Sequence, residues 1–337
     1  MLHHTLRGTH YQIGLRLGSS LAGRGCFLPS QAPFPVTEER LAFARACLPL
    51  YQAWFPSALE ELRGLAEGQG CSQALLAGLV LSMYAMPPAV LCSCFALRKR
   101  GGSVLFGRNS DFLTALEDRN ASCLVRPADS GFSFIGNTTS FLQMEDGVNE
   151  AGLAVGLTSV PPAGPPRPGL NAGMTLRLLL ESCVTVEEAL ILLRQLPLSS
   201  CHTLVLADRT GDLALAECSP GRAAVRRPAG PGAFVCAVNS FHLPEMASFR
   251  REIGDDWQAE ERYQTLTAAL SRLGADMNLQ NGAELLGGKY GFLSQYDRTQ
   301  GRDTVWSVLW DGGRLLRAEG NPLRVPFQED KRLNRGS

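Results

Sequence analysis

Residues 92–111 are Cys-Ser-Cys-Phe-Ala-Leu-Arg-Lys-Arg-Gly-Gly-Ser-Val-Leu-Phe-Gly-Arg-Asn-Ser-Asp, and they contain the most informative pattern of the chain. Alternating apolar side chains after Cys92 predict a strand, and residues 103–107 predict a second strand that returns beside the first. The segment between them is basic and holds two glycines, which tolerate positive φ, so it is typical of a turn. The hairpin therefore brings Arg108 and Asp111 back beside Cys92.

The three side chains that meet in this hairpin suggest a nucleophile. A fixed cation such as Arg108 stabilises a neighbouring thiol as the thiolate, which is the form that attacks carbonyl carbons. We therefore expect Cys92 to be activated. The alternative is that Cys92 is one of several small buried apolar residues, while Arg108 and Asp111 form an ordinary ion pair.

The same stretch resembles the start of the mature chain in N-terminal-nucleophile hydrolases of the choloylglycine hydrolase and isopenicillin N acyltransferase group. Those chains begin with Cys-Thr or Cys-Ser and reach Gly-Arg-Asn-x-Asp after a hairpin. Here the segment from Gly107 to Asp111 matches that motif, at a fitting distance from Cys92. The resemblance implies a hydrolase of linear, non-peptide amides with N-acyltransferase chemistry as a further activity, and it implies no cofactor and no metal.

The resemblance also implies the architecture. We expect an α+β protein, with a four-layer αββα sandwich of two antiparallel sheets over residues 92–337. Residues 1–91 are expected to form a mainly helical pro-segment, removed or nicked by self-cleavage of the Leu91–Cys92 bond. Within that segment, Glu-Leu-Arg-Gly-Leu-Ala-Glu-Gly at 61–68 is similar to a motif of the acyltransferase-like branch.

Hydrophobic periodicity gives a coarse map of the elements, in agreement with this class. Helices are predicted after Thr37, after Ser57 and from Ser72 to about Ala85. Beyond the hairpin, residues 146–152 are interpreted as a turn. Strands are predicted near 121–127, 132–136, 152–159, 202–207, 213–218, 233–238, 304–310 and 314–319, and helices near 174–183, 185–196, 256–273 and 281–287.

Composition excludes several classes of protein. The 337 residues carry 32 basic and 32 acidic side chains, so no net field draws nucleic acid or an anionic membrane. The ten cysteines lack metal-type Cys-x-x-Cys spacing. With no secretory signal and no long apolar span, they indicate reduced thiols and a cytoplasmic protein. The expected partner is a small-molecule amide with an apolar acyl group, as the resemblance implies, and a homo-oligomer stays open.

The resemblance assigns roles residue by residue. Arg108 would sit against the Cys92 thiol, and Asp111 would orient the α-amine that self-cleavage frees. Asn239, in Val-Asn-Ser, matches the asparagine whose amide donates to the oxyanion. Arg262, in Glu-Arg-Tyr, resembles a second arginine near the nucleophile.

Two departures from the family pattern leave other hypotheses open. Bile-salt hydrolases have an asparagine where this chain has Thr158 and Ser159, so these two are candidates for the second oxyanion donor. The residue before the nucleophile is Leu91, where penicillin acyltransferase has glycine. An uncleaved, catalytically silent relative that binds an acylated metabolite, or senses oxidants through Cys92 and Cys94, is therefore an alternative.

A conventional Cys–His hydrolase is the third hypothesis. His202 and His242 are the histidines considered as a base, and His242 is also a candidate for lining the pocket. Ordinary structural roles compete with both assignments, since His202 begins a predicted strand. No nucleophile elbow, Walker motif or Rossmann glycine cluster is present in the sequence.

Overall fold

The computed structural model describes residues 1–30, 32, 34–86, 91–139, 141–162, 164–251 and 256–333. Within them, one sheet has eight strands and the other has six. The larger sheet has the spatial order β1 (Leu2–Gly8), β4 (Ala121–Pro127), β5 (Phe134–Thr138), β6 (Asp146–Asn149), β7 (Leu153–Ser159), β8 (His202–Asp208), β9 (Leu213–Ser219) and β10 (Arg222–Arg226). The smaller sheet has the order β11 (Phe234–Ala237), β2 (Leu91–Arg98), β3 (Val104–Leu113), β12 (Arg302–Trp310), β13 (Leu315–Ala318) and β14 (Gln328–Glu329).

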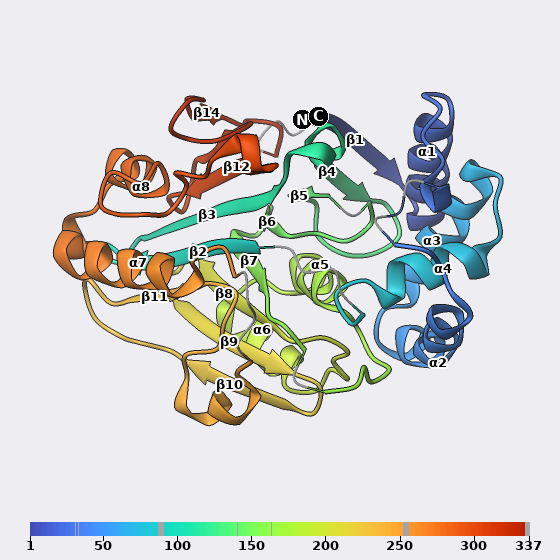
Figure 1. The fold of residues 1–337 in the computed structure, drawn as a ribbon, viewed down its shortest axis with the longest axis horizontal. Coiled ribbons are helices and arrows are strands. Elements are labelled where there is room, and N and C mark those ends of the chain that lie inside the picture. The colour runs from blue at the N-terminus through green and yellow to red at the C-terminus, as the bar shows by residue number, and fades with distance from the viewer. Residues whose placement is uncertain are drawn as a thin grey trace.

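Helices cover the outer face of each sheet. The pair α5 (Ala172–Ser182) and α6 (Val186–Leu193) packs on the larger sheet, and the pair α7 (Ala259–Leu273) and α8 (Leu279–Leu286) packs on the smaller one (Figure 1). The two sheets contact each other through β2, β7 and β8. The predicted α+β class and the four-layer αββα order are thereby confirmed.

Strand β2 lies at the centre of this sandwich and is buried on both faces. Cys94 and Ala96 belong to the apolar cluster between the two sheets. Phe95 and Leu97 belong to the cluster between the smaller sheet and its helices. Successive side chains of a strand point to opposite faces, so a strand with two covered faces is apolar at most of its positions. The buried hydroxyl of Ser93 is the exception in the middle of β2, and it accepts a hydrogen bond from Arg262.

The N-terminal segment contains a strand that periodicity did not predict. β1 pairs in parallel with β4, from Leu2 opposite Ala121 to Gly8 opposite Pro127, so the larger sheet is not wholly antiparallel. Within β1 only His4 and Leu6 are buried. The strand is short and a histidine takes its central inward position, so only Leu2 and Leu6 mark the alternation, and the expectation of a mainly helical segment missed it.

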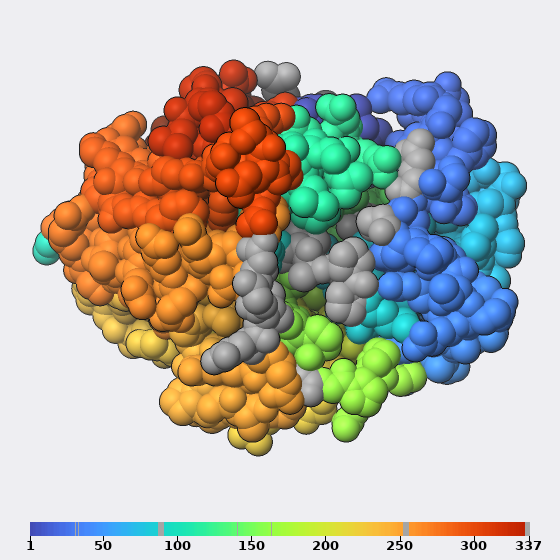
Figure 2. Space-filling model, in the orientation of Figure 1, coloured from blue at the N-terminus to red at the C-terminus, as the bar shows by residue number. Residues whose placement is uncertain are grey.

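Four helices follow β1, and their residues lie together on one side of the molecule, coloured blue to cyan in Figure 2. The helices predicted after Thr37, Ser57 and Ser72 are confirmed, although the second begins at Pro56 and Ser57 does not cap it. The first helix was not predicted. The bounds are α1 (His10–Ala22), α2 (Glu38–Trp54), α3 (Pro56–Gln69) and α4 (Gln73–Ser82).

Glycines allow α1 and α3 to cross with their backbones in contact. A Cβ added at Gly14 would lie 2.0 Å from the carbonyl oxygen of Glu61, and one added at Gly64 would lie 2.0 Å from that of Tyr11. Only a residue without a side chain fits at such a crossing. The family-like motif at 61–68 therefore has a packing function in this structure.

A buried ionic network joins these helices to α5. Arg177 of α5, 1% exposed, donates from Nη1 to Glu61 Oε1 of α3 at 2.9 Å and from Nε to Glu181 Oε1 at 2.7 Å. The Nε2 of His10 in α1 lies 3.0 Å from Glu181 Oε2, and its Nδ1 lies 2.7 Å from Asp129 Oδ1. Charges removed from water need partners of opposite sign. The network therefore ties residues 1–91 to the rest of the chain.

The remaining differences from the predicted map are local. The stretch expected to be a turn at 146–152 begins with β6, whose Asp146–Asn149 are buried. β10 and β14 were not predicted. β3 continues to Leu113, well beyond the predicted end at Gly107, and the other bounds shift by a few residues, as is common at element ends. Short 3-10 helices lie at η1 (Leu28–Ser30), η2 (Thr114–Arg119), η3 (Pro244–Phe249), η4 (Gly274–Asp276) and η5 (Arg298–Gln300). No helix in the described ranges has the length and apolar character that crossing a membrane requires.

Candidate active site

The predicted hairpin is present as β2 and β3, and it places Cys92 near one end of the smaller sheet. In the antiparallel register Cys92 pairs with Ser110, and the preceding residue, Leu91, pairs with Asp111. Arg108 pairs with Cys94, two residues along β2. The thiol residue is 1% exposed. The Cys92, Arg108 and Asp111 expected to meet are therefore together in a buried site.

Arg108 makes direct contact with the nucleophile candidate. Its Nη2 donates to Cys92 Sγ at 2.7 Å, and its Nε donates to the Leu157 carbonyl at 2.9 Å. The other groups around it are carboxylates, with Asp146 Oδ2 at 2.8 Å from Nη1 and Glu145 Oε2 at 3.4 Å from Nη2. Two carboxylates thus balance the charge that Arg108 presents to the thiol.

The burial of Cys92 opposes the expected activation of its thiol in the intact chain. Burial raises the pKa of the Cys92 thiol to about 12, because the thiolate loses its hydration. Arg108 lowers the pKa, but Glu145 and Asp111 raise it. A cation next to a thiol was expected to suffice, whereas in this site desolvation outweighs it, so the thiol is neutral at physiological pH.

Asp111 is fully buried and pairs across the hairpin with Leu91, the residue before the nucleophile candidate. Its Oδ1 accepts from Thr304 Oγ1 at 2.7 Å, and its Oδ2 accepts from the Tyr296 hydroxyl at 3.1 Å. Arg262 Nη1 lies 3.8 Å from Oδ2. Burial raises the pKa of Asp111 to about 6, although these donors and Arg108 oppose the shift.

Asn239 and Arg262 hold the main chain of Cys92. The Cys92 N–H donates to Asn239 Oδ1 at 2.9 Å, and Arg262 Nη1 donates to the Cys92 carbonyl at 2.7 Å. Arg262 also donates from Nη2 to Asn239 Oδ1 at 3.1 Å and from Nη1 to Ser93 Oγ at 2.9 Å. The structure thus brings all five residues proposed as catalytic into one cluster, while their roles remain predictions.

The candidates for a second oxyanion donor lie near this cluster with their polar groups engaged. The Thr158 hydroxyl donates to the Val238 carbonyl at 2.5 Å and lies 2.7 Å from Thr203 Oγ1. The carbonyl of Ser159 accepts from Asn239 Nδ2 at 2.9 Å. Thr158 therefore directs its proton away from the nucleophile, and Ser159 presents an acceptor to Asn239.

Neither histidine hydrogen-bonds to Cys92. His202 is fully buried, with Nδ1 3.0 Å from the Ser200 carbonyl, and burial lowers its pKa to about 4. His242 stacks on Tyr263 with ring centroids 3.5 Å apart, and its Nε2 lies 3.2 Å from Glu260 Oε2. The nucleophile–base hydrogen bond of a Cys–His hydrolase is therefore missing for both. The hydrogen-bond partners of His242 are Glu217 and Glu260, and its place in the pocket stays a prediction.

Sequence reasoning missed four polar residues of this site. Glu145 and Asp146 contact Arg108, while Tyr296 and Thr304 contact Asp111. Asp146 begins the segment interpreted as a turn, and Glu145 immediately precedes it. All but Tyr296 are almost fully buried. The two adjacent carboxylates at 145 and 146 could have been noted as candidate site residues. Their function becomes clear only from the structure, in which both contact the buried Arg108.

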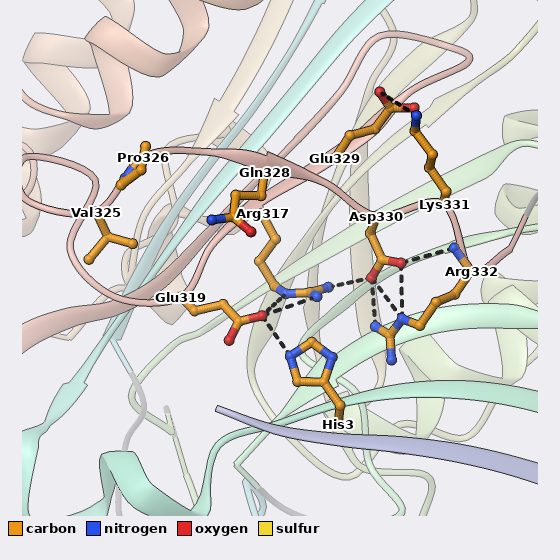
Figure 3. Close-up of a pocket in the computed structure, with 10 residues that line it drawn as sticks. All are labelled: His3, Arg317, Glu319, Val325, Pro326, Gln328, Glu329, Asp330, Lys331 and Arg332. Carbon is orange, nitrogen blue, oxygen red and sulfur yellow. Dashed lines mark hydrogen bonds and ion pairs between the residues drawn. The ribbon is translucent and has the colours of Figure 1, made fainter.

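A separate polar cavity of about 520 Å³ lies near the N-terminal strand and β13, and none of the candidate residues lines it (Figure 3). Its charges pair with one another: Glu319 with His3 and Arg317, and Asp330 with Arg317 and Arg332. Over the described ranges, no group of three or more His, Cys, Asp or Glu side chains is arranged to hold a metal ion.

The chain is similar to known proteins in sequence and in fold. A sequence model described as acyl-coenzyme A:6-aminopenicillanic acid acyl-transferase matches residues 97–315, beginning just after Cys92. A search of curated proteins gave no match.

Several solved structures have a similar fold. A variant of conjugated bile acid hydrolase from Clostridium perfringens aligns with a TM-score of 0.51 and 15% identity, over 73% of this chain and 94% of that chain. The N-acylethanolamine-hydrolyzing acid amidase ortholog of Caenorhabditis elegans aligns with a TM-score of 0.48 and 16% identity, over 66% and 93%. Penicillin V acylase from Agrobacterium tumefaciens aligns with a TM-score of 0.48 and 18% identity, over 68% and 83%. At such identities only the fold of the bile acid hydrolase is informative, and it agrees with the αββα sandwich.

Proposed function

Since this chain belongs to the acyl-coenzyme A:6-aminopenicillanic acid acyl-transferase family, we propose that it cleaves a linear, non-peptide amide through a thioester on Cys92. The observation that carries the proposal is the set of contacts around this one residue. Arg108 contacts the thiol, Asn239 accepts from the main-chain N–H, and Arg262 donates to the carbonyl. Every polar atom of Cys92 is thus engaged by a buried side chain.

The first step proposed is self-cleavage. The Cys92 sulfur attacks the Leu91 carbonyl carbon, the C–N bond of the peptide breaks, and the proton of the thiol passes to the leaving nitrogen, which becomes the α-amine. Water then hydrolyses the thioester, which frees the thiol and leaves a carboxylate on Leu91. The register that sets Asp111 opposite Leu91 supports a role for that carboxylate next to the new amine.

Self-cleavage changes the acid–base chemistry of the site. In the intact chain the raised pKa of the thiol keeps it neutral, and the hydrogen bonds that the His202 and His242 rings make go to other groups. A free α-amine, with an ordinary pKa near 8, supplies a base on the nucleophile itself. The intact chain is on this account a zymogen.

The second reaction uses that base on the substrate. The α-amine takes the proton of the thiol as sulfur attacks the amide carbon, and a tetrahedral oxyanion forms. The amide of Asn239 is the donor we propose for the oxyanion. The leaving amine takes the proton back, and water or another amine then resolves the thioester, so hydrolysis and acyl transfer share the mechanism.

The substrate part of the proposal is an apolar acyl group. Cys92 belongs to the apolar cluster that also contains Leu142, Met144 and Tyr84, which supports an apolar environment for the acyl chain. The fold neighbour from Clostridium perfringens is named a conjugated bile acid hydrolase, in keeping with a hydrolytic reaction. The oxidant-sensing alternative is weakened, because sensor thiols are exposed and of low pKa, whereas Cys92 is buried and of high pKa.

Intact mass spectrometry of the purified protein and of a Cys92→Ala variant tests the proposal. We expect the wild type to separate into fragments 1–91 and 92–337, and the variant to remain one chain. Turnover of amides with acyl chains of increasing length would then define the substrate, with Cys92→Ala as the inactive control. A folded wild type that remains a single 337-residue species lacks the α-amine base, and this result would refute the mechanism.

A further inference from the structure

A strained corner of the backbone lies immediately before α7. Trp257 and Gln258 have φ of 52° and 59°, in the left-handed region that non-glycine residues rarely adopt. Such a conformation is costly and persists only where its surroundings impose it. Here Arg262 imposes it, since its Nε donates to the Trp257 carbonyl at 3.0 Å and its Nη2 to the Asp256 carbonyl at 3.2 Å.

The same guanidinium group holds the nucleophile. Arg262 Nη1 donates to the Cys92 carbonyl at 2.7 Å, and Nη2 donates to Asn239 Oδ1 at 3.1 Å. Arg262 is fully buried. The strained corner and the main chain of Cys92 are therefore fixed to one another through a single rigid, planar side chain.

An aromatic cluster forms a second connection between this corner and the site. The Tyr296 ring packs edge-on against Trp257, with centroids 5.4 Å apart, and against Phe292, with centroids 5.3 Å apart. Trp257 also contacts Arg302, whose guanidinium carbon lies 5.1 Å from the centroid of the Trp257 ring. The Tyr296 hydroxyl then donates to Asp111 Oδ2 at 3.1 Å. The first connection thus ends at the main chain of Cys92. The second ends at the carboxylate of Asp111, the residue that pairs with Leu91 across the hairpin.

We propose that Tyr296 is a positioning residue of this active site, whose phenol holds the Asp111 carboxylate ionised against the amino group of Cys92, and that Trp257 holds the Tyr296 ring. This inference rests on the proposed function, because it acts through the α-amine that self-cleavage frees. The strained corner then has a function, because the backbone conformation that Arg262 stabilises places the Trp257 ring against Tyr296.

The charges around Asp111 decide what loss of the phenol would do. The groups that face it are Arg262 from α7, Arg108 on its own strand, the Cys92 thiol from β2 and the Tyr296 phenol. Removing the phenolic hydroxyl takes one donor from the ionised carboxylate, so the carboxyl keeps its proton to higher pH. The neutral acid then no longer orients an ammonium or amine as an anion does.

The test compares Tyr296→Phe with Tyr290→Phe in self-cleaved protein, using N-acyl aminocoumarin amides as the probe. Tyr290 is the matched control, because its hydroxyl donates to Glu284 outside the site. We expect Tyr296→Phe to lower kcat about tenfold near pH 6.5 with KM unchanged, since a hydrogen bond to a charged group is lost. The deficit should shrink to about threefold or less above pH 8, where Asp111 is ionised in both proteins. Tyr290→Phe should match the wild type throughout.

The outcomes separate the two proposals. A kcat deficit of Tyr296→Phe that is the same at every pH, or no deficit at all, refutes the positioning role while leaving the Cys92 mechanism intact. A Trp257→Leu variant should give the same pH-dependent pattern with a smaller deficit, and a pattern without pH dependence would contradict the role of its ring. A wild type that turns over no amide of the series refutes the proposed function, and the positioning role falls with it.

Discussion

Replacing Glu61 by glutamine tests whether the buried network fixes residues 1–91 to the rest of the protein. Glu61 lies on α3 and is 1% exposed, and both of its oxygens accept from Arg177 on α5. The substitution keeps the shape of the side chain and removes its charge. Arg177 would then remain buried with Glu181 and the Leu142 carbonyl as its partners.

The size of the effect follows from burial. Removing one partner of a fully buried ion pair typically costs about 3–5 kcal/mol, because the other charge stays out of water without compensation. Glutamine can still accept one hydrogen bond from Arg177, and the Glu181 carboxylate still compensates part of its charge. We therefore expect the lower end of this range, about 3 kcal/mol. Glu60 on the same helix is the matched control: its pair with Arg63 joins side chains that are about half exposed. Exposed pairs contribute about 0–1 kcal/mol.

Urea denaturation gives the comparison, with all variants made in a Cys92→Ala background so that the chain stays in one piece. Glu61→Gln should lower the free energy of unfolding by about 3 kcal/mol, and Glu60→Gln by less than about 1 kcal/mol. If both substitutions lower the free energy of unfolding by the same small amount, the buried network stabilises the protein no more than an exposed ion pair does. The attachment of residues 1–91 must then be explained by apolar packing alone.

Two further predictions concern the packing of the helices and the pH dependence of stability. Gly64→Ala places a Cβ against the Tyr11 carbonyl and should destabilise the protein by about 1–3 kcal/mol. Gly164→Ala is the control, because its Cβ would meet no atom within 4 Å, and it should leave the stability unchanged. Equal urea midpoints for the two variants would contradict the close crossing of α1 and α3. Because the pKa of Asp111 is raised to about 6 in the folded protein, the folded state binds more protons than the unfolded state between about pH 4 and pH 6. The free energy of unfolding should therefore fall as pH rises through this window, by roughly 3 kcal/mol relative to an Asp111→Asn variant in the same Cys92→Ala background. Parallel pH profiles of the two proteins would show that Asp111 is not buried as described.

Much of the site could be read from the sequence because its central part is local. Cys92, Arg108 and Asp111 belong to one hairpin, and the register of a two-stranded element follows from alternation and turn chemistry. The spacing thus carries the geometry. Asn239 and Arg262 lie far along the chain, and only the family resemblance pointed to them.

The sequence could not show what burial does to these groups. A pKa depends on the hydration that the fold removes and on charges brought in from other elements. Glu145 and Asp146 approach Arg108 only when the larger sheet packs on the smaller one. The same holds for Tyr296, which meets Asp111 through the packing of a loop.

The sequence by itself determined the hairpin, the α+β class and, through the resemblance, the family, since these depend on local pattern and on a motif of fixed spacing. The tertiary structure decided that β1 joins the larger sheet, that Arg177 binds residues 1–91 through Glu61, and that the Cys92 thiol is neutral in the intact chain. These properties arise from desolvation and from contacts between distant segments, whose energies depend on positions that no local pattern encodes.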